Sequence, residues 1–272
     1  MVREKTRLIL LLLNTLLMTT LLIKLILMPT IMGLVTLVGR KWGMTIGGWV
    51  SSLPWVAGPI SVFLALEQGI SFAASAAASA LAAVIGLVGF CWVYLRLVFQ
   101  FSWIICSLAG FCTYIGIAVV FRYVLPLPAW VIFATVLTSV VIALRSLPMP
   151  RAIASPTKPP KYDIPLRMSV ATVFVLFVTV LAQLLGTAWS GLLTPFPILT
   201  SILAAFTHHQ QGADATVRIF RGLVYGLFGF TSFLFLVCLM VASFPIPVTY
   251  GIAFLVALSI NMLTFRLLRQ NT

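Results

Sequence analysis

Acidic residues are rare in this chain, and only one of them adjoins a predicted membrane span. The four are Glu4, Glu67, Asp163 and Asp214, out of 272 residues. Glu67 ends a predicted apolar helix, whereas the other three lie in terminal or loop positions. Burial in a membrane is costly for a charge and favours the protonated carboxyl, so Glu67 could carry a proton in coupled transport. The alternative is a solvated carboxylate at the membrane surface without a functional role.

Two adjacent histidines, His208 and His209, follow a second predicted helix of the same kind. An imidazole changes its charge near neutral pH, so the pair could sense pH or relay protons. The alternative is a polar cap at the membrane interface. Because no third His or Cys stands at ligand spacing, we expect no metal site, and no motif indicates a cofactor.

Four basic residues are candidates for contact with an anion. Arg218 and Arg221 are three residues apart on one helix face, where they could hold a lipid phosphate or an anionic substrate group. Lys24 and Arg167 occupy equivalent positions at the start of two apolar runs. For all four, the alternative is an anchoring role, in which a long basic side chain reaches the membrane surface.

Prolines interrupt two apolar segments at related positions. Pro54, Gly58 and Pro59 interrupt the first segment, and Pro195 and Pro197 interrupt the second. Proline removes a helical hydrogen bond, and the freed backbone groups are tolerated inside a membrane only within protein or beside a water-filled cavity. We therefore predict a substrate site between the two broken helices, with candidate residues Ser51, Pro54, Gly58, Thr194, Pro197, Thr200 and Ser201. Simple kinks relieved by Ser and Thr hydroxyls are the alternative.

The elements that must position these residues are apolar and helical. Hydrophobic residues make up 62% of the chain, charged residues 8%, and the mean hydropathy is +1.17, which excludes a water-soluble domain. At about 20 apolar residues per crossing, the sequence predicts an all-α polytopic membrane protein with about nine helices, within a range of eight to ten. The predicted helices are 24–40, 46–66, 70–95, 98–121, 128–145, 167–188, 190–207, 216–242 and 247–265.

An internal repeat relates the two broken helices. A shift of 143 positions aligns Gly69 with Gly212, together with other residues on both sides of them. The Pro-x-Pro motif at 126–128 recurs at 245–247, a shift of only 119, which leaves room for one extra helix in the first half. The extra helix would give the halves opposite orientations. Inverted repeats of this kind are typical of secondary transporters, which bind substrate near the membrane midplane.

The proline-rich stretch from Pro148 to Pro165 divides the chain into these halves. We predict one membrane repeat at 24–145, a cytoplasmic linker at 146–166 and a second repeat at 167–272. The apolar segment at 1–23 either extends the first helix, crosses separately or lies on the membrane surface.

Basic residues predict the topology. Seventeen Lys and Arg against four acids give a net charge of +13. If the first helix runs from outside to inside, twelve basic residues of the later loops and helix ends fall on the cytoplasmic side, and Arg122 alone falls outside. This distribution follows the positive-inside rule, so we expect a multi-pass protein with a cytoplasmic C-terminus, and no nucleic-acid partner.

A stripe of small residues, Ala74, Ala78, Ala82 and Gly86, recurs every four positions along one predicted helix. Small residues let helix backbones approach closely. The stripe is therefore predicted to pack either within the bundle or at the seam of a homodimer.

The segment Ser190-Gly-Leu-Leu-Thr-Pro-Phe-Pro197, with Thr216, Arg218 and Gly222 downstream, resembles small bacterial membrane proteins of the GlpM type. Those proteins carry a Gly-Leu-x-Pro-x-Phe-Pro core, from which this chain departs in the position of its first proline. The resemblance covers about 60 of the 272 residues. It implies a protein of the bacterial inner (cytoplasmic) membrane with a role in polyol or exopolysaccharide metabolism.

These features favour a secondary transporter of a small solute, an anion being one option. The alternative is a non-transporting membrane scaffold or a lipid-binding accessory protein in envelope or exopolysaccharide metabolism. Membrane lipids are the expected partners in either case. Because the sequence holds no nucleophile, phosphate-binding or metal-hydrolase motif, no enzymatic activity is predicted.

Overall fold

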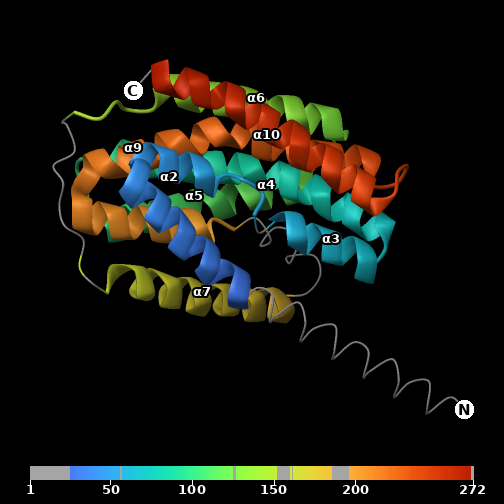
Figure 1. Ribbon diagram of the computed structural model, residues 1–272, viewed down its shortest axis with the longest axis horizontal. Coiled ribbons are helices and arrows are strands. Elements are labelled where there is room, and N and C mark those ends of the chain that lie inside the picture. Colours follow the sequence, from blue (N-terminus) through green and yellow to red (C-terminus); the bar gives the residue numbers. More distant parts are fainter. Residues whose placement is uncertain are drawn as a thin grey trace, which may run out of the picture.

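The computed structural model describes residues 25–55, 57–124, 127–151, 160, 162–185 and 196–270. These residues form nine helices and no β-sheet, which confirms the predicted all-α class for the described part of the chain (Figure 1). The helices are Leu25–Trp42, α2 (Met44–Ser51), α3 (Ala57–Glu67), α4 (Ile70–Leu97), α5 (Trp103–Val124), α6 (Ala129–Ser146), α7 (Asp163–Leu185), α9 (Ile198–Met240) and α10 (Ile246–Gln270).

Six helical segments within the described residues are long and apolar enough to cross a membrane. They are Leu25–Trp42, Ile70–Leu97, Trp103–Phe121, Ala129–Ser146, Ile198–Met240 and Ile246–Leu268. A span of the hydrocarbon core takes roughly 20 residues in a helix. The chain is therefore a multi-pass helical membrane protein, as the composition predicts.

Three predicted helices differ in the structure. The segment 46–66 folds as two short helices, α2 and α3, separated by a turn between Ser51 and Ala57. From Ile198 to Met240, the segments predicted at 190–207 and 216–242 form the single helix α9, which bends at Gly212 without an intervening loop. Residues 190–195 lie outside the described residues. The other predicted helices begin and end within about five residues of the observed bounds.

Three glycines form the sharp corners between consecutive helices. Gly43, Gly69 and Gly212 have φ angles of 99°, 90° and 85°, with ψ angles of 153°, 166° and −176°. This backbone region is essentially restricted to glycine, because a side chain would clash there. Each corner turns the chain back on itself within one residue, so the helices on either side lie close together (Figure 1).

The helices α4 and α9 supply most of the packed core. Rings of Phe90, Tyr94 and Phe220 meet there, with 5.0 Å between the centroids of Tyr94 and Phe220. The short helix α2 lies directly against α9. A Cβ atom added to Gly48 would collide with the Ile219 carbonyl, so glycine permits backbone-to-backbone packing at this crossing.

The predicted small-residue stripe lies partly inside the bundle. Ala82 and Gly86 are buried, and a Cβ on Gly86 would lie 3.0 Å from the Tyr114 ring of α5. Ala74 and Ala78 are half-buried. Packing within the chain thus accounts for the later part of the stripe, and the homodimer stays a prediction.

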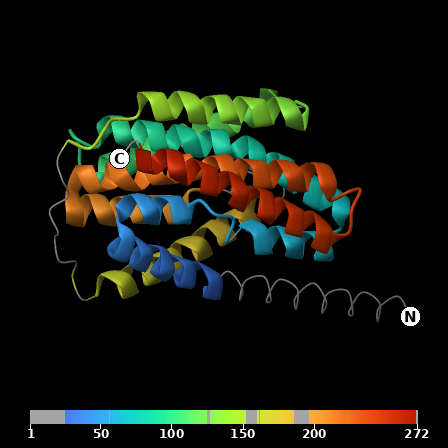
Figure 2. The ribbon, with the colours of Figure 1, turned by 45° about the horizontal axis from the view of Figure 1, so that its top comes forward.

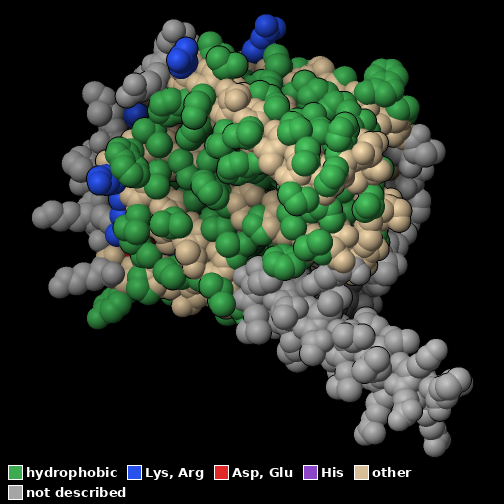
Figure 3. Space-filling model, turned by 45° about the vertical axis from the view of Figure 1, so that its right-hand side comes forward, with side chains coloured by type: hydrophobic (Ala, Val, Ile, Leu, Met, Phe, Trp, Pro, Cys, Tyr) green, Lys and Arg blue, Asp and Glu red, His purple; other side chains and the backbone are tan. Residues whose placement is uncertain are grey.

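The outer surface of the bundle is apolar over a wide area (Figure 3). Val173, Leu255 and Ile142 are 67%, 65% and 61% exposed, as expected for side chains that face lipid. The C-terminal ends of Leu25–Trp42, α4, α6 and α10, which carry Arg40, Arg96, Arg145 and Arg266, lie together at one end of the bundle (Figure 1). We call this the basic end. Its predicted cytoplasmic location stays a prediction.

Candidate functional site

The first helix break lies between α2 and α3 and is caused by Pro54. Proline has no N–H to donate to the Val50 carbonyl, which instead accepts bonds from the Leu53 N–H (3.2 Å) and the Trp55 ring N–H (3.0 Å). Ser51 ends α2, and Pro54 is buried in the turn. The helix resumes when the Gly58 N–H bonds to the Pro54 carbonyl at 2.9 Å.

The prediction that Gly58 and Pro59 also break this helix is wrong. Both lie in the first turn of α3. The first N–H groups of a helix have no partner within it, so a proline there removes no bond.

The second interruption lies at the start of α9. Pro197 is the residue that precedes the helix, and the Ser201 N–H donates to its carbonyl at 2.8 Å. Thr200 and Ser201 are both buried in the first turn. The predicted site residue Thr194 lies outside the described residues.

A cavity of about 130 Å³ lies between these two interruptions. Ser51, Pro197 and Thr200 line it, so the structure brings together three of the residues predicted for a substrate site. Pro54, Gly58 and Ser201 lie close by in the same segments without lining it.

The cavity lies near the middle depth of the bundle. Leu223, Leu227 and Phe230 line one wall, and they fall around the middle of the α9 segment that follows the Gly212 corner. Met28 and Ile31 of the first described helix line another wall. The cavity is thus lined by helices from both halves of the chain.

The lining is mostly apolar, with a few hydroxyl groups. The hydroxyl groups of Ser51 and Ser52 donate to the carbonyls of Gly48 (2.6 Å) and Trp49 (2.7 Å) and keep lone pairs free to accept. None of the described residues that line the cavity is ionisable. The cavity therefore suits the apolar or weakly polar part of a small molecule, and a charged group would need partners elsewhere.

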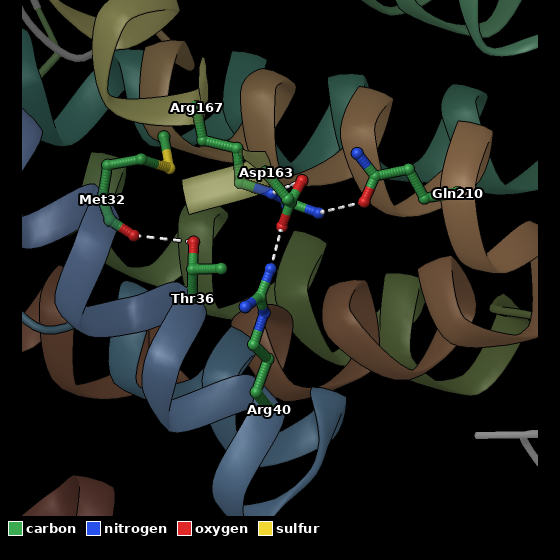
Figure 4. Close-up of polar contacts among 6 residues, drawn as sticks. All are labelled: Met32, Thr36, Arg40, Asp163, Arg167 and Gln210. Atoms are coloured by element: carbon green, nitrogen blue, oxygen red, sulfur yellow. Dashed lines mark hydrogen bonds and ion pairs between the residues drawn. The ribbon is translucent and has the colours of Figure 1, made fainter. Parts of the chain in front are cut away.

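An ionic cluster lies near the basic end, beside a small cleft of about 10 Å³ (Figure 4). Asp163 accepts a bond from Arg40 Nη2 at 2.6 Å and another from Arg167 Nε at 2.8 Å. Arg167 Nη2 also reaches the Gln210 side-chain oxygen at 3.4 Å, and its guanidinium lies over the Phe206 ring. Asp163 and Arg167 are each 2% exposed.

The prediction that Asp163 lies in a loop is wrong, because α7 begins at Asp163 and buries it. Arg167, predicted to hold an anion, holds this carboxylate of the chain itself. Arg40, one of the twelve basic residues expected on the cytoplasmic side, has only a topological role in the sequence prediction. The sequence does predict one pair of this cluster. Asp163 and Arg167 are four residues apart, so their side chains lie together on a helix. Lys24, the predicted counterpart of Arg167, lies outside the described residues.

Two of the three predicted proton-carrying residues, His208 and His209, do not line the cavity. Glu67 is the last residue of α3, and its side chain is outside what the structure describes. His208 is half-buried, with its Nδ1 atom 3.2 Å from the Tyr94 hydroxyl. His209 is exposed and meets the edge of Trp103. Proton coupling through these residues stays a prediction.

Arg218 and Arg221 follow the Gly212 corner in α9 and do not line the cavity. Arg221 is 3% exposed, and its Nε and Nη1 atoms have no hydrogen-bond partner among the described residues. An anchoring role at the membrane surface does not fit a side chain buried to this degree. Contact of this pair with an anion or a lipid headgroup stays a prediction.

Comparison with known proteins finds no protein family, curated protein or solved structure that matches this chain. The resemblance to GlpM-type proteins therefore stays a prediction. The cavity and the ionic cluster are the structural evidence for a function.

Proposed function

We propose that the protein is a secondary transporter in which a small solute crosses the membrane through the cavity between the two broken segments. The cavity carries this proposal, because it lies at mid-depth and residues from both halves of the chain line it. Broken helices beside a mid-depth cavity are a recurrent means of binding substrate in transporters. The non-transporting scaffold gives no reason for a cavity at this position.

Helix bounds support an inverted repeat as the framework of this site. At the shift of 143, the end of Leu25–Trp42 corresponds to the end of α7 at Leu185, and the end of α4 at Leu97 corresponds to the end of α9 at Met240. The start of α5 at Trp103 corresponds to the start of α10 at Ile246. Gly69 and Gly212 share their rare backbone conformation as well. The additional helix of the first half is then α6, and not the helix before the Pro-x-Pro motif (α5) that the shift of 119 indicates.

Chain direction supports the inversion. In Figure 1 the helix Leu25–Trp42 runs opposite to α7, and α5 runs opposite to α10. The single additional helix α6 accounts for this reversal, because one crossing between two repeats inverts the second relative to the first. Two inverted halves around one cavity can expose it to either membrane face by rocking against each other.

Access to the cavity from both membrane faces tests this function. In a background without Cys91, Cys106, Cys112 and Cys238, the variant Ser51→Cys carries a single thiol at the cavity. We expect a small membrane-impermeant thiol reagent to label it in sealed vesicles of either orientation. Leu255→Cys, which points outward from α10, is the control that should stay unlabelled. Labelling of Ser51→Cys from one face alone, or from neither, would contradict transport and favour the scaffold.

A further inference from the structure

The cavity and the small cleft lie on one line between the same four helical segments. Each segment contributes residues to the cavity and, about one turn (roughly 5.4 Å) nearer the basic end, residues to the cleft. The pairs, cavity residue first, are Ile31 and Val35, Ser51 and Gly47, Thr200 and Leu203, and Leu223 and Ile219. The cleft therefore continues the cavity toward the basic end.

The ionic cluster closes this line at the basic end. Arg40 and Arg167 both line the cleft, and Asp163 bridges them. Arg40 belongs to the first described helix, and the other two belong to α7, which lies beside it in both ribbon views (Figure 1, Figure 2). Passage between the cleft and the basic end requires this bridge between the two helices to open.

The ionic cluster beside the cleft can accept more negative charge than the described carboxylate in it provides. Two guanidinium groups face one carboxylate, so one positive charge in the cluster is not neutralised. Thr207 lines the cleft, is 1% exposed, and its hydroxyl has no hydrogen-bond partner within the described residues. A ligand acceptor at this point would satisfy a hydroxyl that is otherwise buried at a cost.

We propose that the transported solute is a small amphiphilic monoanion, such as a short-chain carboxylate. Its acidic group binds Arg40 in place of Asp163, which keeps its bond to Arg167, with Thr207 as an additional donor, and its apolar body extends into the mid-depth cavity. This inference rests on the proposed transport function.

The chemistry of the two voids sets this class of ligand. Arginine pairs with planar anions through two parallel hydrogen bonds, which a carboxylate matches. The cavity lining is apolar and not ionisable, so it suits a hydrocarbon body and disfavours a second charge. The ligand carboxylate pairs with Arg40 while Asp163 stays paired with Arg167, so each guanidinium group has one carboxylate and the link between the two helices is released.

The unfolding temperature of the purified protein in neutral detergent tests this proposal, with sodium butyrate as the probe. Sodium chloride, n-butanol, n-butylammonium chloride and sodium phosphate are compared at equal ionic strength. We expect butyrate alone to raise the unfolding temperature with saturation. In Arg40→Gln the apparent butyrate affinity should fall about tenfold or more, because the guanidinium group that pairs with the ligand carboxylate is lost. Lys41→Gln, a neutral substitution at the adjacent residue, should bind butyrate within about twofold of the original protein.

Arg40 is chosen because its side chain is 27% exposed, so its variant retains a better chance of folding than a variant of buried Arg167. The proposal would be overturned if butyrate raised the unfolding temperature no more than chloride does. It would also be overturned if Arg40→Gln bound butyrate with the same affinity as the original protein. Phosphate that acts as well as butyrate would overturn the role of the apolar body. If Ser51→Cys is labelled from both faces while butyrate fails to bind, transport stands and the substrate class is wrong. If butyrate binds while labelling is confined to one face, the anion site stands and transport is wrong.

Discussion

At the scale of single residues, Asp163 has the largest expected effect on stability. Its carboxylate joins Arg40 and Arg167, and both Asp163 and Arg167 are buried. Removal of one partner from a buried ion pair typically costs about 3–5 kcal/mol, because a charge remains without compensation. We expect Asp163→Ala to lower the free energy of unfolding by roughly 3 kcal/mol, measured by chemical unfolding in detergent micelles.

The double variant Asp163→Ala/Arg167→Met separates this explanation from a simple loss of contacts. Removal of both buried charges abolishes the uncompensated cation, so the double variant should be more stable than Asp163→Ala alone. A double variant that is less stable than the single one would contradict the account of the cluster. Lys41→Gln should change stability by less than about 0.5 kcal/mol.

Residue-level prediction from sequence succeeds where a local signal exists and fails for long-range pairs. Ser51, Pro197 and Thr200 are predicted from proline-interrupted apolar runs, and they do line one cavity. Asp163 and Arg40 are 123 positions apart, and no local pattern relates them. The positive-inside rule already explains a basic residue at a helix end, so the sequence gives no reason to expect a further role for Arg40.

At the scale of the elements, the glycine corners determine where one helix ends and the next begins. Gly69 and Gly212 have positive φ angles of 90° and 85° in a region that is unfavourable for other residues. We expect Gly69→Ala and Gly212→Ala each to lower the free energy of unfolding by about 1–3 kcal/mol. No atom lies within 4 Å of a Cβ built at either position, so the cost is one of backbone conformation.

Gly116→Ala is the matched control for the corner glycines. Gly116 lies within α5, and a Cβ at this exposed position also meets nothing within 4 Å. Because its backbone is helical, alanine should be neutral or should stabilise the protein by up to about 1 kcal/mol. Equal effects of Gly69→Ala and Gly116→Ala in the same measurement would show that the corners need no glycine.

The helices themselves follow from the sequence more closely than their interruptions do. The predicted helix 70–95 corresponds to Ile70–Leu97, because an uninterrupted apolar run after Gly69 defines it. The position of the break in 46–66 depends on which proline lies in the first turn of the following helix, where it breaks no hydrogen bond. This in turn depends on the residue at which α3 begins. Only the turn around Pro54 determines this start, and the spacing of the prolines does not show it.

At the scale of the whole molecule, inversion of the halves predicts the membrane face that each polar helix end meets. Gln68 and His209 are both exposed and lie at the ends of corresponding helical segments before Gly69 and Gly212. In a cysteine-free background, we expect Gln68→Cys and His209→Cys to be labelled by an impermeant thiol reagent from opposite faces. Labelling of both from the same face would exclude the inverted arrangement.

The membrane class and the segregation of basic helix ends could be predicted from composition, because lipid leaves few other options for an apolar chain. That both halves line one cavity could be expected only through the internal repeat. The closure of the cavity toward the basic end could not, since it depends on how α7 packs beside the first described helix.

Transport as proposed requires the basic end to open and close over the cavity that both halves share. A reversible lock at the cleft tests this movement. Thr36 and Thr207 line the cleft from different helices, so histidines at both positions can bind Zn²⁺ together and hold the cleft shut. In Ser51→Cys/Thr36→His/Thr207→His, we predict that Zn²⁺ abolishes labelling of the cavity thiol from the face at the basic end and leaves labelling from the opposite face unchanged. A chelator should restore it, and Ser51→Cys alone should not respond to Zn²⁺. Labelling from the face at the basic end that persists while Zn²⁺ is bound would contradict the account.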